Sequence, residues 1–225
     1  MSSPSDSEIR ETIRNTWFKQ SAKGPAHFRW IFPIYLAFLT NVTESYDNLA
    51  QKTAQTISYS TKNYDFQFLL KADSDSFVRV GSILKSLRDI ANPRLYWEFL
   101  DGRSKPFRFG KWKEIDWMLC VRYLPSLHYL KYYISENVLL GVWLEGTNAK
   151  YVHDPRFDKY QSRGCNNEYL VKHKKSPQQM KALFANMQQT GKLCFIEFQA
   201  PPSYIYDFSV LPSQCCTRRN NSVIP

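Results

Sequence analysis

The sequence has little glycine and no long apolar run. Glycine accounts for 8 of the 225 residues and aromatic residues for 16%, which excludes a fibrous repeat and a disordered linker. The longest apolar stretch, residues 30–39, contains a proline and is about half of the roughly 20 residues that a membrane-spanning helix needs. Residues 1–7 are polar and lack the basic and apolar regions of a signal peptide. We therefore expect a globular protein, and if it works in the secretory pathway, its targeting segment is absent from this sequence.

Several motifs that would identify a reaction are also missing. The sequence has no P-loop, no GxGxxG and no HExxH, so the usual signatures of nucleoside triphosphatases, dinucleotide-binding enzymes and zinc proteases are excluded. It has no GxSxG elbow, which makes a serine hydrolase a poor hypothesis. An EF-hand is excluded because the acidic segment around residue 73 lacks the required glycine and the closing glutamate.

The cysteines show neither a CxxC pair nor a histidine at zinc-finger spacing, so we expect disulfides rather than a structural zinc site. Their number is odd, so at least one thiol is left over: Cys120, Cys165, Cys194, Cys215 and Cys216. Glycosylation sequons at Asn41 and Asn220 agree with a luminal location.

The formal net charge of +10 favours anionic partners such as nucleic acid, an acidic polysaccharide, a sugar nucleotide or a membrane surface. The densest basic runs, residues 172–175 and 218–219, are too short for a nucleic-acid-binding arm, and no nucleic-acid-binding motif is present. We therefore expect no nucleic acid partner. Taken alone, these runs are best interpreted as solvated surface.

Hydrophobic periodicity predicts alternating helices and strands. Apolar residues at helical spacing predict helices at residues 5–20, 46–57, 80–87 and 176–191. The last has the clearest ends, because a capping box opens it and a glycine closes it. Apolar runs predict strands at 28–39, 66–70 and 95–100, while residues 138–144 fit either a helix or a strand. The alternation predicts one α/β domain spanning residues 1–225, with a mostly parallel sheet and helices on both faces.

Two acidic residues, Asp73 and Asp75, follow the strand predicted at 66–70. Open α/β sheets bind their ligands at the carboxyl ends of strands. Two carboxylate oxygens can share a Mn²⁺ or Mg²⁺ ion, and the ion can bridge a diphosphate. An Asp-x-Asp pair alone is weak support for such a site, because exposed loops also carry one for solubility.

Nine short segments spread through most of the chain share a pattern: residues 10–17, 44–49, 68–77, 94–97, 111–114, 123–125, 153–158, 162–165 and 212–216. Among the most specific are His-Asp-Pro-Arg-Phe-Asp at 153–158 and Pro-Ser-Gln-Cys-Cys at 212–216. Together the segments resemble glycosyltransferase family 31, the β-1,3-glycosyltransferases.

The resemblance implies a GT-A fold, which is a Rossmann-like α/β arrangement, and an inverting transfer of galactose from UDP-galactose with Mn²⁺ as cofactor. As acceptor it implies the galactosyl-xylosyl-serine of a proteoglycan core protein, so the product would belong to the glycosaminoglycan linkage. It further implies a location in the Golgi lumen, with attachment to the Golgi membrane through an anchor that is absent from this sequence.

The resemblance also assigns roles to individual residues. Asp75 and His173 would bind Mn²⁺, and Lys71 with Asp73 would help to hold the nucleotide. Arg14 would face the donor pyrophosphate, although a surface ion pair is an equal alternative for this residue. For His173 the alternative is an ordinary surface position in a basic run.

The sequence departs from the family pattern where a catalytic base is needed. The family has aspartate within Glu-Asp-Val, whereas this chain has Glu136 followed by Asn137. Asparagine cannot accept a proton at neutral pH, which leaves Glu136 as the only nearby candidate for the base. Family segments are also missing near 28–41 and 125–133, so we expect a shortened domain. A second hypothesis is therefore a catalytically impaired relative that binds glycosaminoglycan or another carbohydrate through its basic face.

Overall fold

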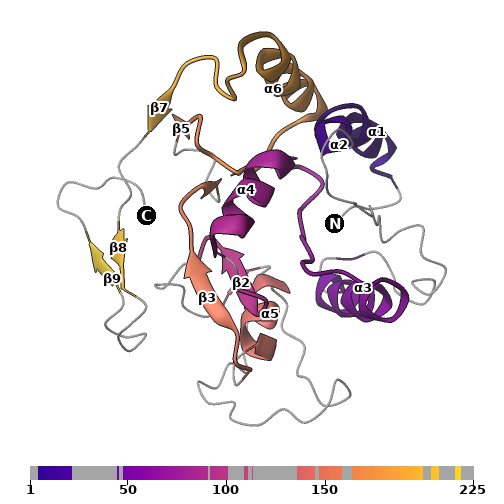
Figure 1. The fold of residues 1–225 in the computed structure, drawn as a ribbon. Coiled ribbons are helices and arrows are strands. Elements are labelled where there is room, and N and C mark those ends of the chain that lie inside the picture. The colour runs from indigo at the N-terminus through magenta and orange to yellow at the C-terminus, as the bar shows by residue number, and fades with distance from the viewer. Residues whose placement is uncertain are drawn as a thin grey trace.

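The computed structural model describes the following parts of the chain: residues 5–21, 45, 48–90, 92–100, 109–110, 113, 136–144, 147–158, 164–199, 204–207 and 216–218. The strand predicted at 28–39 and both sequon asparagines lie outside these residues. The same is true of the places near 28–41 and 125–133 where family segments are predicted to be missing. Figure 1 shows the arrangement of the described helices and strands.

The helices of the described residues are α1 (Ser7–Asn15), α2 (Trp17–Ser21), α3 (Leu49–Asn63), α4 (Val80–Ile90), α5 (Glu136–Leu144) and α6 (Pro177–Thr190). The helices predicted at 46–57, 80–87 and 176–191 are confirmed as α3, α4 and α6, although α3 begins and ends later than predicted. Residues 138–144, which fit either type of structure, belong to helix α5.

The helix predicted at 5–20 is divided in two at Thr16. The hydroxyl of Thr16 donates a hydrogen bond to the carbonyl oxygen of Thr12 at 2.7 Å. Such a bond offers the backbone an alternative to the helical pattern and bends helices. The predicted apolar face survives the break, because Ile13 and Trp17 are 2% and 4% exposed.

Helix α6 has the ends that its sequence predicts. The Ser176 side chain accepts from the backbone N–H of Gln179 at 3.2 Å, and the Gln179 side chain accepts from the Ser176 N–H at 2.9 Å. This reciprocal capping box satisfies two of the N–H groups that a helix start leaves without a partner. Gly191 ends the helix with a φ of 72°, a left-handed conformation that costs glycine little.

The described strands are β1 (Phe77–Val78), β2 (Leu95–Glu98), β3 (Lys150–His153), β4 (Phe157–Asp158), β5 (Gly164–Cys165), β6 (Val171–Lys172), β7 (Phe198–Gln199), β8 (Tyr204–Tyr206) and β9 (Cys216–Arg218). They form a three-stranded sheet in the order β1-β6-β4 and three two-stranded sheets, β2-β3, β5-β7 and β8-β9. The pairs β2-β3 and β4-β6 are parallel, and the other three pairs are antiparallel. The mixed α/β class is confirmed, whereas a mostly parallel GT-A sheet stays a prediction.

The strand predicted at 66–70 does not form, while the one predicted at 95–100 is confirmed as β2. The apolar side chains of the first segment are between 38% and 46% exposed: Phe66, Phe68, Leu69 and Leu70. An extended apolar run becomes a strand only where a neighbour pairs with its backbone. In the described part of the chain, pairing starts after the acidic segment, at Phe77.

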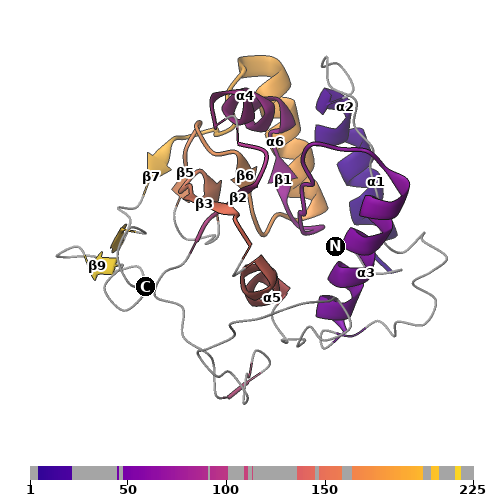
Figure 2. The same cartoon turned by 60° about the horizontal axis from the view of Figure 1, so that its bottom comes forward.

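The larger core lies where α1, α4 and α6 enclose the β1-β6 pair (Figure 2). Helix α1 packs against α6, and α2 packs against α4. Phe77 of β1 and Met180 of α6 have no exposed surface, and burying a side chain of this size contributes about 1.5–3 kcal/mol. Strand β1 is therefore held in the larger of the two cores that the described residues form.

A smaller core joins α3 to α5. Ala50 of α3 and Leu139 of α5 are 1% and 0% exposed and form a separate cluster, with Val142 and Trp143 packed against it. Among the described residues, no helix combines the length and apolar character that crossing a bilayer requires.

Candidate metal centre

The pairing of β1 with β6 brings together two segments that are far apart in the sequence. Phe77 pairs with Lys172 and Val78 with Val171, and the strands run in opposite directions. The residue before Phe77 must therefore lie opposite the residue after Lys172. These two residues are Ser76 and His173, and the Ser76 hydroxyl lies 3.2 Å from His173 Nδ1.

Two carboxylates of the acidic loop, residues 71–76, lie close to His173 at this point. Asp73, Asp75 and His173 each offer one ligand atom within 4.8 Å of the others. Asp75 Oδ1 lies 3.4 Å from His173 Nδ1. A turn closed by the Ser76 N–H, which donates to the Asp73 carbonyl oxygen at 3.1 Å, places the two carboxylates on the same side of the loop. The Asp-x-Asp pair and His173 are thus brought together as predicted, although their metal role stays a prediction.

The donor set fits a small divalent cation. At bond lengths of about 2.1 Å, neighbouring ligand atoms of an octahedral ion lie about 3 Å apart and opposite ones about 4.2 Å apart. The 3.4 Å between Asp75 and His173 is close to the first of these values. Carboxylate oxygens and an imidazole suit Mn²⁺ or Mg²⁺. The three side chains are 37%, 42% and 23% exposed, so water or a substrate oxygen has access to the remaining coordination positions.

A lysine of the same loop adjusts the charge of this cluster. Lys71 Nζ lies 3.6 Å from Asp73 Oδ1. Burial would raise the pKa of Asp73, but Lys71 and His173 outweigh this effect and hold its pKa below the usual value. Asp73 is therefore a carboxylate at neutral pH, as a metal or nucleotide site requires.

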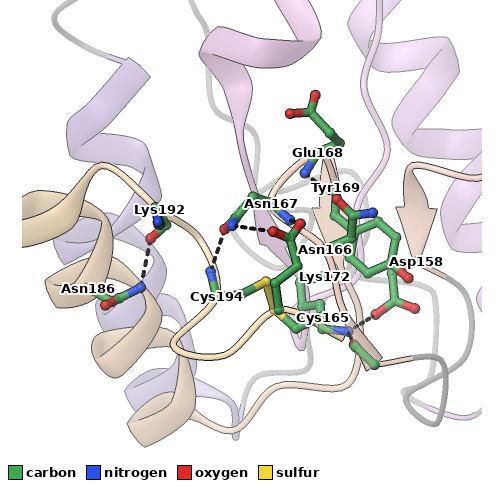
Figure 3. Close-up of a disulfide and its surroundings, with 12 residues drawn as sticks. Asp158, Cys165, Asn166, Asn167, Glu168, Tyr169, Lys172, Asn186, Lys192 and Cys194 are labelled. Carbon is green, nitrogen blue, oxygen red and sulfur yellow. Dashed lines mark hydrogen bonds and ion pairs between the residues drawn. A yellow bond between two sulfur atoms is a disulfide. The ribbon is translucent and has the colours of Figure 1, made fainter. Parts of the chain in front are cut away.

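A buried ion pair lies beside the cluster, on the neighbouring residue of β6 (Figure 3). Lys172 Nζ lies 2.6 Å from Asp158 Oδ2, and it also donates to the carbonyl oxygen of Gly164. The Lys172 and Asp158 side chains are 5% and 1% exposed. Burial raises the pKa of Asp158, and Lys172 only partly offsets that rise. Lys172 of β6 thus contacts both Asp158 of β4 and Gly164 at the start of β5.

This pair corrects the interpretation of residues 172–175 as solvated surface. Only Lys174 is exposed, whereas Lys172 is buried and His173 and Lys175 are partly buried. A basic run cannot reveal this by itself, because burial of Lys172 depends on the parallel pairing of Asp158 with Lys172. The His-Asp-Pro-Arg-Phe-Asp motif contains Asp158, and it was the signal that could have indicated a partner.

A disulfide between Cys165 and Cys194 confirms the expected disulfide chemistry for one cysteine pair. The bridge joins β5 to the chain just before β7, and Figure 3 shows it next to Lys172 and Asn167. The Cys194 N–H donates to Asn167 Oδ1 at 3.0 Å, which fixes the same two segments a second time. The loop that the disulfide closes contains His173 and all of α6.

For the remaining predicted site residues, the structure gives a position on a helix but does not test their roles. Glu136 and Asn137 form the first turn of α5, so the predicted base lies at a helix start. Arg14 is exposed in the last turn of α1. The catalytic roles of Glu136 and Asn137 and the donor-binding role of Arg14 stay predictions.

Comparison with curated proteins shows what the chain is similar to. It is 36% identical over 263 residues to β-1,3-galactosyltransferase 6 of Mus musculus, which covers 97% of this chain and 81% of the relative. It is 29% identical over 179 residues to hydroxyproline O-galactosyltransferase GALT2 of Arabidopsis thaliana, covering 67% of this chain and 26% of that protein. It is 28% identical over 180 residues to UDP-GalNAc:β-1,3-N-acetylgalactosaminyltransferase 2 of Danio rerio, covering 68% of this chain and 35% of that protein.

These matches differ in how much of each relative they span. No protein-family model matches the chain. The chain covers most of the mouse relative but only about a third or less of the plant and fish relatives. The similarity to the mouse protein extends through 97% of this chain. The chain therefore belongs to the β-1,3-galactosyltransferase family of hexosyltransferases.

Proposed function

We propose that this protein is an inverting, Mn²⁺-dependent galactosyltransferase that uses UDP-galactose as donor. Its acceptor is the galactosyl-xylosyl-serine of proteoglycan core proteins, to which it adds galactose in β-1,3 linkage, in the Golgi lumen. The observation that carries this proposal is the convergence of Asp73, Asp75 and His173 on one small volume. The similarity to mouse β-1,3-galactosyltransferase 6 supports the β-1,3-galactosyl transfer.

The residues of the cluster have separate roles in binding the donor. Asp75 and His173 hold the ion, whose positive charge, when it is bound, stabilises the departing UDP. Asp73 and Lys71 line the same loop and hold the nucleotide side of the donor. The partial exposure of Asp73, Asp75 and His173 leaves room for a diphosphate to approach.

The acceptor hydroxyl has to lose a proton during the transfer, so a base is needed. Asn137 cannot take this role because an amide does not accept a proton at neutral pH. We assign the role to Glu136, its neighbour in the first turn of α5. Galactosyl transfer by wild-type protein but not by the Glu136→Gln variant would support the assignment.

The proposal is tested by measuring UDP binding with and without Mn²⁺. We expect wild-type protein to bind UDP only when Mn²⁺ is present. The Asp75→Ala variant should lose this Mn²⁺-dependent binding of UDP. The matched control is Asp65→Ala, which removes an exposed aspartate outside the cluster. Equal Mn²⁺-dependent binding by wild type and Asp75→Ala would rule out the proposed metal site.

Asn137 favours one alternative, a carbohydrate-binding relative without turnover. That protein would bind heparin with a strong dependence on salt and no dependence on Mn²⁺. The two functions are separated by incubating wild type and Asn137→Asp with UDP-galactose, Mn²⁺ and a galactosyl-xyloside. Transfer by wild type supports the enzyme, and transfer by Asn137→Asp alone supports a binding protein that lost its base.

A further inference from the structure

Lys175 is held next to the metal cluster by its own backbone. Its N–H donates to the carbonyl oxygen of Asp75 at 2.7 Å. The residue lies just beyond β6 and just before the Ser176 cap of α6, so both of its neighbours in the chain are also fixed. Lys175 cannot leave the acidic loop without breaking this hydrogen bond.

Lys175 is partly buried, yet no carboxylate of the described residues forms an ion pair with it. Burial lowers the pKa of Lys175 and the Lys172 ammonium adds to this effect, while Asp158 and Asp75 counter it. A charge removed from water needs a partner. The adjacent Lys174 differs, because it is exposed and needs none.

The two nearby carboxylates are already engaged. Asp158 forms an ion pair with Lys172 (Figure 3), and 2.6 Å separates Asp158 Oδ2 from Lys172 Nζ. Asp75 faces His173 at 3.4 Å in the cluster that fits a divalent ion. Lys175 therefore has a fixed position and a charge that neither carboxylate neutralises directly.

The charges around the cluster indicate what would neutralise Lys175. Asp73 and Asp75 contribute two negative charges, and Lys71 and Lys175 contribute two positive charges. A divalent cation would leave the site with a net charge of about +2, which matches the two negative charges of a nucleotide-sugar diphosphate. With a diphosphate bound, the charges of the site balance without a further carboxylate from the described residues.

We propose that Lys175 binds the diphosphate of the nucleotide-sugar donor and stabilises it as it leaves, an inference that rests on the proposed function. In the transfer, the bond between the anomeric carbon and a diphosphate oxygen breaks, and its electron pair stays on that oxygen. The acceptor oxygen bonds to the anomeric carbon and gives its proton to the base. Lys175 neutralises part of the charge left on the diphosphate.

The test compares Lys175→Met with Lys174→Met, which removes the same charge from the adjacent exposed position. At saturating Mn²⁺, we expect Lys175→Met to weaken UDP binding by about 10-fold or more, because a charge-assisted hydrogen bond is lost. Lys174→Met should change it by less than about 2-fold. Isothermal titration calorimetry with UDP gives both values, and thermal unfolding checks that each variant is folded.

Three further measurements make the result specific. Binding of Mn²⁺ alone and binding of uridine, which has no phosphate, should be the same in Lys175→Met and wild type. Lys175→Arg, which keeps the charge, should recover most of the UDP affinity. Equal UDP affinity in wild type and Lys175→Met, or an equal loss for uridine, would overturn this inference alone. A wild type that binds no UDP with Mn²⁺ would overturn the proposed function as well.

Discussion

Two side-chain pairs, one at Lys172 of β6 and one at His173 just after it, are adjacent and have opposite properties. Asp158 and Lys172 are 1% and 5% exposed and 2.6 Å apart. Asp75 and His173 are 42% and 23% exposed and 3.4 Å apart. The first pair is closed off from solvent, and Asp158 Oδ1 stays buried without a hydrogen-bond partner, whereas the second pair is accessible to further ligands. The difference teaches that burial, more than residue type, separates a structural ion pair from a ligand site.

The two pairs should also differ in energetics. Moving two charges out of water is costly, so each member of a buried pair depends on its partner. An exposed pair gains little from its attraction, because water and salt screen it. Removing one member should therefore damage the fold in the first case and ligand binding in the second.

The largest effect is expected from Asp158→Ala, which leaves the Lys172 ammonium buried without its carboxylate. We expect a loss of about 3–5 kcal/mol in the free energy of unfolding, measured by chemical denaturation. The double variant Asp158→Leu with Lys172→Met should recover most of this loss, because an apolar pair needs no counter-charge. A loss below about 1 kcal/mol for Asp158→Ala would show that the pair is not structural in this sense.

Asp75→Ala should show the reverse pattern. We expect the affinity for Mn²⁺ to fall by about 100-fold, or about 2.8 kcal/mol of binding free energy, because one of the two proposed protein ligands is lost. The metal-free protein should change its free energy of unfolding by less than about 0.5 kcal/mol, because the side chain is exposed. Titration with Mn²⁺ and denaturation with a chelator give the two numbers. A stability loss as large as that of Asp158→Ala would remove the contrast between the pairs.

A third carboxylate, Asp154, lies between these extremes and sharpens the comparison through pH. Its side chain is 10% exposed and accepts hydrogen bonds from Arg156 and from Trp97 Nε1 at 3.0 Å. Burial alone would raise its pKa, but these hydrogen bonds outweigh burial and hold the pKa below the usual value. The stabilisation is therefore complete above the unfolded pKa of about 3.9 and is lost as the pH falls through the lower folded pKa.

Asp154→Asn should lower the free energy of unfolding by about 1–2 kcal/mol at neutral pH. The difference between wild type and variant should shrink as the pH falls below about 4. Denaturation curves at several pH values measure this difference. A gap that stays constant down to the lowest pH would mean that the charge of Asp154 does not contribute.

The smallest effect is expected from Ser176→Ala, which breaks the capping box of α6. We expect a loss of about 1 kcal/mol in the free energy of unfolding. Mn²⁺ affinity should stay within about 2-fold of wild type, because Ser176 contributes no ligand. A large loss of Mn²⁺ affinity would show that α6 has to be capped for His173 to reach its position.

Local patterns predicted the elements whose causes are local. The capping box, the glycine at 191 and the buried face of Ile13 and Trp17 depend on residues within one or two turns of helix. The register between β1 and β6 depends on residues 97 positions apart, such as Ser76 and His173, and no local pattern encodes it. His173 was therefore identified only through resemblance to a family.

The two wrong predictions, a strand at 66–70 and an exposed Lys172, also arise because local patterns do not encode contacts between distant segments. The apolar run at 66–70 satisfies every local rule for a strand, yet among the described residues it has no strand partner and is partly exposed. Lys172 looked like surface because its neighbours are basic, and its burial depends on Asp158 of another strand. Composition predicts what a segment can do, while pairing with distant segments determines what it does.

The disulfide separates the three side chains of the cluster into two kinds of chain segment. Cys165 and Cys194 are 29 positions apart, and the loop they close carries His173 but neither Asp73 nor Asp75. A chain synthesised under reducing conditions has the same acidic loop, but its histidine segment samples many more unfolded conformations. Closing the disulfide therefore restricts the unfolded conformations of the His173 segment and not those of the segment with Asp73 and Asp75. Under the proposed metal role, a chain that folds without this disulfide should hold the ion more weakly.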